Sequence, residues 1–89
     1  MASLVNMGGT PVNLTGSGAV SLTPGTLIGF YVNSTSSGTI VLRDGGSSAT
    51  AVTGTITPAI GWHAFNGTFA TSCYATLGST INVTFIFQA

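Results

Sequence analysis

Four side chains have types that commonly carry acid–base, nucleophilic or metal chemistry, and each stands alone: Arg43, Asp44, His63 and Cys73. Glycosidase-type catalysis needs two carboxylates, whereas Asp44 is the only acidic side chain. A metal ion needs several ligands, so the one conceivable metal site is shared around a symmetry axis, with His63 from each subunit. Serines for a Ser-His-Asp triad are plentiful, but no nucleophile elbow or phosphate-binding glycine loop occurs. The sequence therefore predicts no catalytic, cofactor or metal site, and the protein is expected not to be an enzyme.

These lone residues also have structural interpretations. Cys73 has no cysteine to pair with inside the chain, and we expect it to be a small buried hydrophobe. His63 is expected to be partly buried beside Trp62. Arg43 is the best candidate for a specific polar contact with a partner. The alternative is a local pair with Asp44, which contributes about 0–1 kcal/mol when exposed.

Apolar side chains supply the other candidate interface residues. Trp62, Phe65 and Phe69 could anchor an interface, where aromatic residues are enriched, although the core is the alternative for all three. Residues 1–10 are predicted to form an N-terminal arm or edge strand, followed by a single β-sandwich domain over residues 11–89. The arm could pack on a neighbouring subunit, pair with its own sheet or fray. Its apolar side chains are Leu4, Val5 and Met7.

The charge balance limits the classes of partner. The formal net charge is zero, and polarity comes from glycine and from the 25 serines and threonines among 89 residues. Without a basic cluster, the chain lacks the means to neutralise nucleic-acid phosphates or to bind an anionic membrane surface. Its apolar runs are too short to span a bilayer. Residues 1–4 do not resemble a secretory signal, so we expect such a signal to be absent or already removed. We therefore expect protein partners, with no nucleic acid and no membrane.

Four of the five asparagines begin an Asn-x-Thr motif, the acceptor pattern for N-glycosylation: Asn13, Asn33, Asn66 and Asn82. Such matches arise readily by chance in a chain so rich in threonine. We interpret them as β-strand composition, because no secretory signal accompanies them.

Turn residues and β-branched runs predict the strands of the first half. Residues 27–32 and 39–43 are expected to form a hairpin around a loop at 33–38. Residues 23–26 fit a type II turn with Gly25 at positive φ. Alternation predicts that Val20 and Leu22 point inward, and Asp44-Gly45-Gly46 is expected to turn the chain.

The second half is predicted in the same way. Residues 50–57 alternate as a strand, and Asn66-Gly67 indicates either a two-residue hairpin or an irregular loop over 66–72. Residues 74–77 and 81–87 are expected to be strands around a turn at Gly78-Ser79. No window has the 3.6-residue period of a helix. The predicted fold is all-β, an antiparallel β-sandwich or jelly-roll-like barrel of about eight short strands.

The size of the chain predicts association. A domain of 89 residues buries a comparatively small share of its surface, so the free energy gained by apolar burial about equals the entropic cost of ordering the chain. A disulfide is impossible inside this chain and a metal site is not predicted. We therefore expect a homo-oligomer, or docking on a larger scaffold.

Four segments, which lie within residues 24–87, carry a resemblance to a known family. They read FYVNSTSSGTIVLRDG (30–45), TITPAIGWHAF (55–65), YATLG (74–78) and NVTF (82–85). These segments resemble small structural proteins of tailed bacteriophages. The resemblance implies an all-β capsid decoration or cement protein on the virion surface, clustered as a trimer and clamping the major capsid protein or other virion proteins. It implies no ligand-binding residues.

Two other functions remain open. A head- or tail-fibre module that recognises the host surface would display an exposed aromatic platform, for which the candidates are Tyr31, Trp62 and Tyr74. A secreted, fimbria-like adhesive subunit is disfavoured, because the chain has neither a secretory signal nor a cysteine pair.

Overall fold

The computed structural model describes residues 9–89, and this part of the chain is all-β and contains no helix. Its five strands are β1 (Thr10–Leu14), β2 (Gly18–Ser21), β3 (Gly25–Asp44), β4 (Gly61–Phe69) and β5 (Cys73–Gln88). All pair antiparallel in one sheet, in the order β1-β5-β3-β4, with β2 also paired to β5. The described residues form five strands, whereas about eight were expected. An eight-stranded sandwich or jelly roll is not confirmed.

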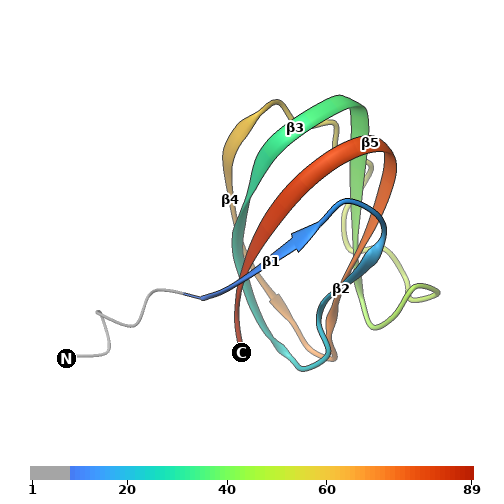
Figure 1. Cartoon of the computed structure of the whole chain (residues 1–89). Helices are drawn as coiled ribbons and strands as arrows, with labels where there is room; N and C mark the ends of the chain where they lie inside the picture. The colour runs from blue at the N-terminus through green and yellow to red at the C-terminus, as the bar shows by residue number, and fades with distance from the viewer. Residues whose placement is uncertain (1–8) are drawn as a thin grey trace.

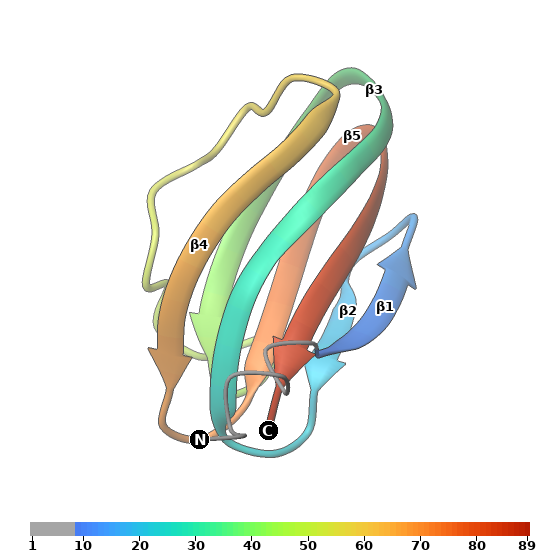
Figure 2. The ribbon, with the colours of Figure 1, turned by 90° about the vertical axis from the view of Figure 1, so that its left-hand side faces the viewer.

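The two long strands β3 and β5 pair along almost their whole length and bend together (Figure 1). The first part of β3 lies between β4 and the last part of β5, whose far edge pairs with β1. The last part of β3 pairs with the first part of β5, which carries β2. Figure 2 shows β4, β3 and β5 side by side along this curve. The bend thus divides the sheet into a β4 half and a β2 half.

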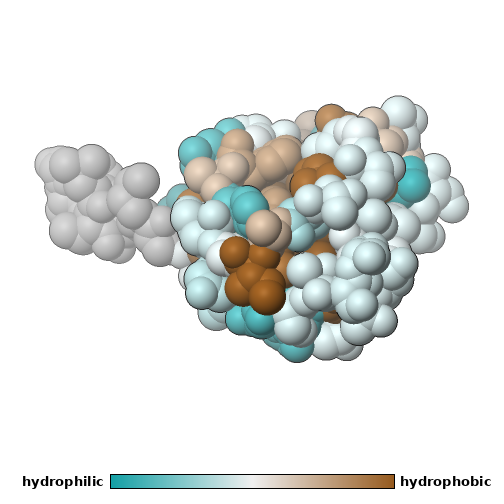
Figure 3. Space-filling model, turned by 90° about the horizontal axis from the view of Figure 1, so that it is seen from above, coloured by the Kyte–Doolittle hydropathy of each residue, from teal (hydrophilic) through white to brown (hydrophobic). Residues whose placement is uncertain are grey.

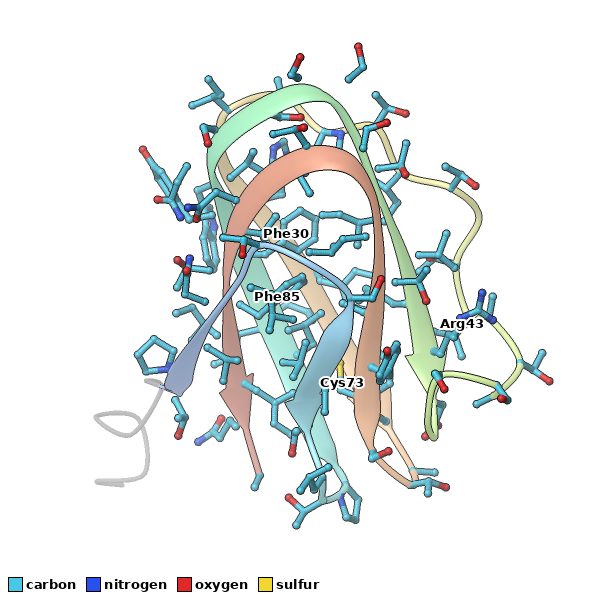
Figure 4. The ribbon with its side chains drawn as sticks, turned by 45° about the vertical axis from the view of Figure 1, so that its right-hand side comes forward. Phe30, Arg43, Cys73 and Phe85 are labelled. Atoms are coloured by element: carbon cyan, nitrogen blue, oxygen red, sulfur yellow. The ribbon has the colours of Figure 1, made fainter. Side chains whose placement is uncertain are left out.

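The core lies between the two halves of the bent sheet. Phe30 on β3 and Phe85 on β5 point into this space, with their ring centroids 5.7 Å apart, and Cys73 lies below them (Figure 4). The predicted alternation in residues 81–87 is confirmed, because every second side chain from Ile81 to Phe87 is buried. Burial of these apolar side chains is the main force that holds the halves together. The buried apolar residues are Val20, Leu27, Phe30, Val32, Ile40, Leu42, Phe69, Cys73, Ala75, Ile81, Val83, Phe85 and Phe87.

The predicted hairpin at residues 27–43 is wrong. Residues 33–38 lie inside β3, and the two segments that they join both pair with β5 instead of with each other. Ser37 has a φ of 58°, and the register shifts between Ser36 and Thr39 because two residues of β3 stand opposite one of β5. This β-bulge bends the strand without reversing it. Ser79, with a φ of 56°, is the matching residue of β5, so the predicted turn at Gly78-Ser79 is also a bend.

Neither prediction for Asn66-Gly67 is correct. Both residues lie within β4, where Asn66 has a φ of 58° and forms a bulge opposite Ile28 of β3. Asparagine adopts a left-handed backbone in a bulge as it does in a hairpin turn, and of these two residues only Asn66 has a positive φ. The chain reverses only at residues 70–72, just after β4.

The remaining turn predictions have mixed outcomes. The turn at Asp44-Gly45-Gly46 is confirmed, with Gly45 at a φ of 138°. Gly25 is not among the residues with positive φ and begins β3, so the type II turn at 23–26 is wrong. Val20 is buried as predicted, whereas Leu22 is 84% exposed in the connection to β3. Residues 50–57 make two isolated bridges to β3 and form no continuous strand.

The predicted N-terminal arm falls almost wholly outside the described residues. Only Gly9 and Thr10 of its ten residues are described, and Thr10 begins β1. Its candidate interface residues Leu4, Val5 and Met7 therefore lie outside the described part of the chain.

Candidate functional site

Arg43 and Asp44 end β3 and bind different parts of the chain. The guanidinium of Arg43 donates to Thr76 Oγ1 at 2.9 Å and to the carbonyl oxygen of Ala49 at 2.8 Å. It lies on the outer side of β3 (Figure 4). Successive side chains of a strand point to opposite faces, so the two neighbours reach different partners. Arg43 is a candidate for a contact with a partner or for a local pair with Asp44. In this structure its Nε and Nη1 donors bind β5 and the segment after β3 on its own chain.

Asp44 organises the reversal between β4 and β5. Its carboxylate accepts hydrogen bonds from the backbone N–H groups of Ala70 and Thr71, both at 2.8 Å, and of Ser72 at 3.3 Å. The Ser72 hydroxyl in turn donates to the carbonyl oxygen of Gly45. The backbone donors, led by Ala70 and Thr71, favour the charged form and lower the pKa of Asp44. The only carboxylate side chain therefore has a structural role.

His63 and Cys73 face the interior. The His63 ring lies 5.4 Å from the Phe30 ring, and its Nε2 lies 2.8 Å from the carbonyl oxygen of Ala59. The predicted partial burial of His63 is confirmed. Cys73 is fully buried as predicted, and burial raises the pKa of its thiol to about 12. Within residues 9–89 no three His, Cys, Asp or Glu side chains gather in a way that could hold a metal ion.

The aromatic candidates separate into core and surface. Phe69 is 1% exposed and stacks on Phe65, so the core alternative holds for it. Trp62 and Tyr31 are 48% and 47% exposed and stand directly opposite each other on β4 and β3. Directly opposed residues share one face of a sheet. Tyr74 is half-buried and pairs with Arg43 on the β2 half, away from the other two.

Next to these two rings lies a group of asparagines that sequence analysis did not bring together. Asn13 on β1 donates from Nδ2 to Asn82 Oδ1 at 2.8 Å, to Thr84 Oγ1 at 3.1 Å and to the carbonyl oxygen of Val83 at 3.2 Å. Asn33 on β3 donates from the other side, to Asn82 Oδ1 and Thr84 Oγ1, both at 3.0 Å. Two β5 side chains thus receive amides from both neighbouring strands.

The register joins the asparagines and the rings into one row. Asn13 pairs with Thr84, Thr84 with Tyr31, and Tyr31 with Trp62, across all four strands of the β4 half. We call this surface the amide–aromatic face; it consists of Asn13, Tyr31, Asn33, Trp62, Asn82 and Thr84. Three of its asparagines begin the Asn-x-Thr motifs. In a strand, residues i and i+2 share a face, so that motif could have indicated one amide and one hydroxyl side by side.

Gly29 positions the indole of Trp62. A Cβ atom at Gly29 would lie 2.6 Å from Cη2 and Cζ2 of Trp62, so the ring lies directly over this glycine. One side of the Trp62 indole therefore lies against the sheet at Gly29, and the side chain is about half exposed. This contact restricts the orientation of the indole.

The surface as a whole is neutral and shallow. No pocket is found in the described part of the chain. Figure 3, which views the molecule from above, shows mostly pale residues of intermediate hydropathy with small hydrophobic patches in brown. The amide–aromatic face itself contains no charged residue. It can offer hydrogen bonds and ring stacking without ion pairing.

Comparison with family models, with curated proteins and with solved structures finds no match to this chain. Residues 9–89 contain no helix long and apolar enough to cross a bilayer.

Proposed function

We propose that this chain is a non-enzymatic structural protein of a virion, a capsid cement or decoration protein that binds between capsid subunits as an oligomer, with a trimer favoured. One observation carries the proposal furthest. Five large apolar side chains are each about half exposed or more, on a surface that carries almost no charge: Leu22, Tyr31, Val52, Ile60 and Trp62. Interfaces are depleted in charge at their centre and enriched in aromatic residues, and this surface has both properties.

A cement protein stabilises the capsid shell through its binding equilibrium. A protein that binds the assembled shell, and not its separated subunits, stabilises the shell by RT ln(1 + [L]/Kd) at each site. An oligomer adds avidity, because the first contact raises the effective concentration of the others. Uncharged contacts also make such binding insensitive to salt, since screening acts on charges.

Copy number tests this proposal. The amount of this chain relative to the major capsid protein is measured in purified virions by quantitative mass spectrometry. A cement protein is expected in a fixed ratio of the order of the number of capsid subunits. A handful of copies per particle would rule out cement function.

A second candidate function is a head- or tail-fibre module for host-surface recognition, and the amide–aromatic face favours it. Tyr31 and Trp62 are two of the three residues that sequence analysis named as an aromatic platform, and they stand side by side. Binding of the purified, fluorescently labelled protein to whole host cells tests this candidate. A cement protein without a recognition role would leave the cells unlabelled.

We also propose that the bent sheet closes its core as a β-sandwich does, with the β4 half and the β2 half as its two layers. Inner-face residues of both halves meet in a single core, which supports this classification.

A further inference from the structure

We propose that the amide–aromatic face is a binding site for a neutral glycan, in which a pyranose ring stacks on Tyr31 and Trp62 and its hydroxyls bond to the asparagine group. This inference deepens the second candidate function and rests on it, since it names the ligand class for host-surface recognition. It does not depend on which part of a virion carries the chain.

The rings provide the apolar contact. A pyranose presents patches of C–H groups on its faces, and a flat, exposed aromatic ring buries such a patch from water. Tyr31 and Trp62 are about half exposed and adjacent, and Gly29 leaves room for the indole to lie against the sheet. The exposure of both rings gives the ligand access, and the packing of Trp62 limits the entropy lost on binding.

The asparagines provide amide donors and acceptors that the fold does not use. The amide nitrogens of Asn13 and Asn33 are used within the group, and Asn82 Oδ1 accepts from both. Among the described residues, these bonds leave Oδ1 of Asn13 and of Asn33 as open acceptors and Nδ2 of Asn82 as an open donor. A sugar hydroxyl both donates and accepts, so this mixed set matches it.

The spacing lets one sugar use both parts of the face. Tyr31 on β3 stands directly opposite Thr84 on β5, and the strands of a sheet are about 4.8 Å apart. A ring stacked on Tyr31 therefore has its edge next to Asn82, Thr84 and Asn33. Because no charge lies on this face, a sulfated or sialylated glycan would gain no ion pair, which is why we infer a neutral sugar.

Trp62 is the only tryptophan in the chain, so its fluorescence reports directly on the proposed site. The purified protein is titrated with maltopentaose, cellopentaose, mannopentaose and chitopentaose, and with heparin and polysialic acid as anionic probes. At least one neutral oligosaccharide is expected to give a saturable fluorescence change, with a Kd that stays the same up to about 1 M salt. No response to any neutral probe, or a response to the anionic probes alone, would overturn the inference.

Paired variants locate the site. Tyr31→Ala is expected to weaken binding about tenfold, and Asn33→Ala by about three- to tenfold, from the loss of ring contact and of a hydrogen bond. The matched controls are Leu22→Ala, an exposed apolar residue in the connection after β2, and Ser47→Ala, an exposed polar residue in the connection after β3. Both controls should bind as the wild type does. Far-UV circular dichroism verifies that each variant is folded.

Amide chemical shifts in nuclear magnetic resonance spectra provide a second readout that does not depend on Trp62. Sugar-induced changes confined to the β4 half, around the six residues of the face, support the inference. Unchanged affinity in folded Tyr31→Ala and Asn33→Ala would refute it. So would a fluorescence change that follows protein concentration without sugar, because a second copy of the chain would then cover the face. Labelling of host cells without any neutral-glycan binding would defeat this inference but not the second candidate function.

Discussion

At the scale of single residues, Asp44 makes stability depend on pH. Its three backbone donors hold its pKa below the ordinary value of 3.8. A carboxyl with a lower pKa in the folded chain stabilises the fold fully above its unfolded pKa, and this contribution is lost as the pH falls through the folded pKa. We therefore expect the urea midpoint to fall below about pH 4 in the wild type.

Asp44→Asn isolates this effect, because Asp44 is the only acidic side chain in the sequence. The variant keeps one acceptor for the backbone at residues 70–72 but cannot ionise. Its midpoint should be lower than that of the wild type at pH 7 and should change less between pH 5 and pH 3. Urea titrations at a series of pH values measure both quantities. Parallel acid profiles for the two proteins would show that another group causes the loss.

Cys73 gives a second residue-scale prediction. It is fully buried and its thiol has a pKa of about 12, so the folded protein should not react with a thiol reagent at pH 8. Labelling should proceed only as fast as the chain opens. Cys73→Ala should lower the free energy of unfolding by about 1 kcal/mol, because it leaves a small cavity. Fast labelling under native conditions would contradict the burial of this residue.

The role of a residue can be predicted from the sequence when it depends on residues nearby in the chain, and not when it depends on a contact with a distant strand. The burial of Cys73 and of the inner side chains at 81–87 follows from residue type and alternation alone. The amide–aromatic face does not, because Asn13 meets Asn82 across 69 residues of sequence. The Asn-x-Thr motif can place an amide and a hydroxyl on one strand face. Only the register between strands places three asparagines together.

At the scale of elements, the same turn residues can either reverse a strand or bend it. Residues 33–38 and Gly78-Ser79 have the composition of two turns, yet each lies in a strand whose partner bends at the same level. Local propensity cannot distinguish these outcomes, because the difference lies in pairing with a segment about 40 residues away. Fewer strands form than predicted because each bend has the sequence of a strand end, and because residues 50–57 make only isolated bridges.

Gly38 tests the bend directly. A Cβ atom there would lie 2.5 Å from Ile81 Cβ and 2.9 Å from the carbonyl oxygen of Thr80, across the strand pair. Gly38→Ala should therefore force β3 and β5 apart and lower the free energy of unfolding by about 1–3 kcal/mol. Gly16→Ala is the matched control, because a Cβ at Gly16 meets nothing within 4 Å. Its effect should remain within about 0.5 kcal/mol. Equal stability of the two variants in urea unfolding would contradict the close approach at the bend.

At the scale of the whole molecule, the surface carries almost no charge. The chain has one positive and one negative side chain, and both are bonded within the fold. Solubility therefore depends on hydroxyls, amides and backbone groups. Such a surface lacks the long-range repulsion between like charges that keeps proteins apart. Its contacts with neighbours are expected to be short-ranged and insensitive to salt.

The proposed oligomer makes stability depend on protein concentration. If subunits fold and associate together, dilution shifts the equilibrium towards unfolded chains, so Tm rises with concentration by mass action. We expect light scattering to give the mass of a trimer at micromolar concentration, and Tm to increase measurably over a hundredfold range of concentration. Trp62→Ser and Leu22→Ser remove exposed apolar surface from the β4 half and from the connection after β2, respectively. A lower Tm and a smaller mass for only one of them would locate the subunit contact. A monomer whose Tm is high and independent of concentration would show that the single domain is sufficient by itself, and oligomerisation would then be excluded.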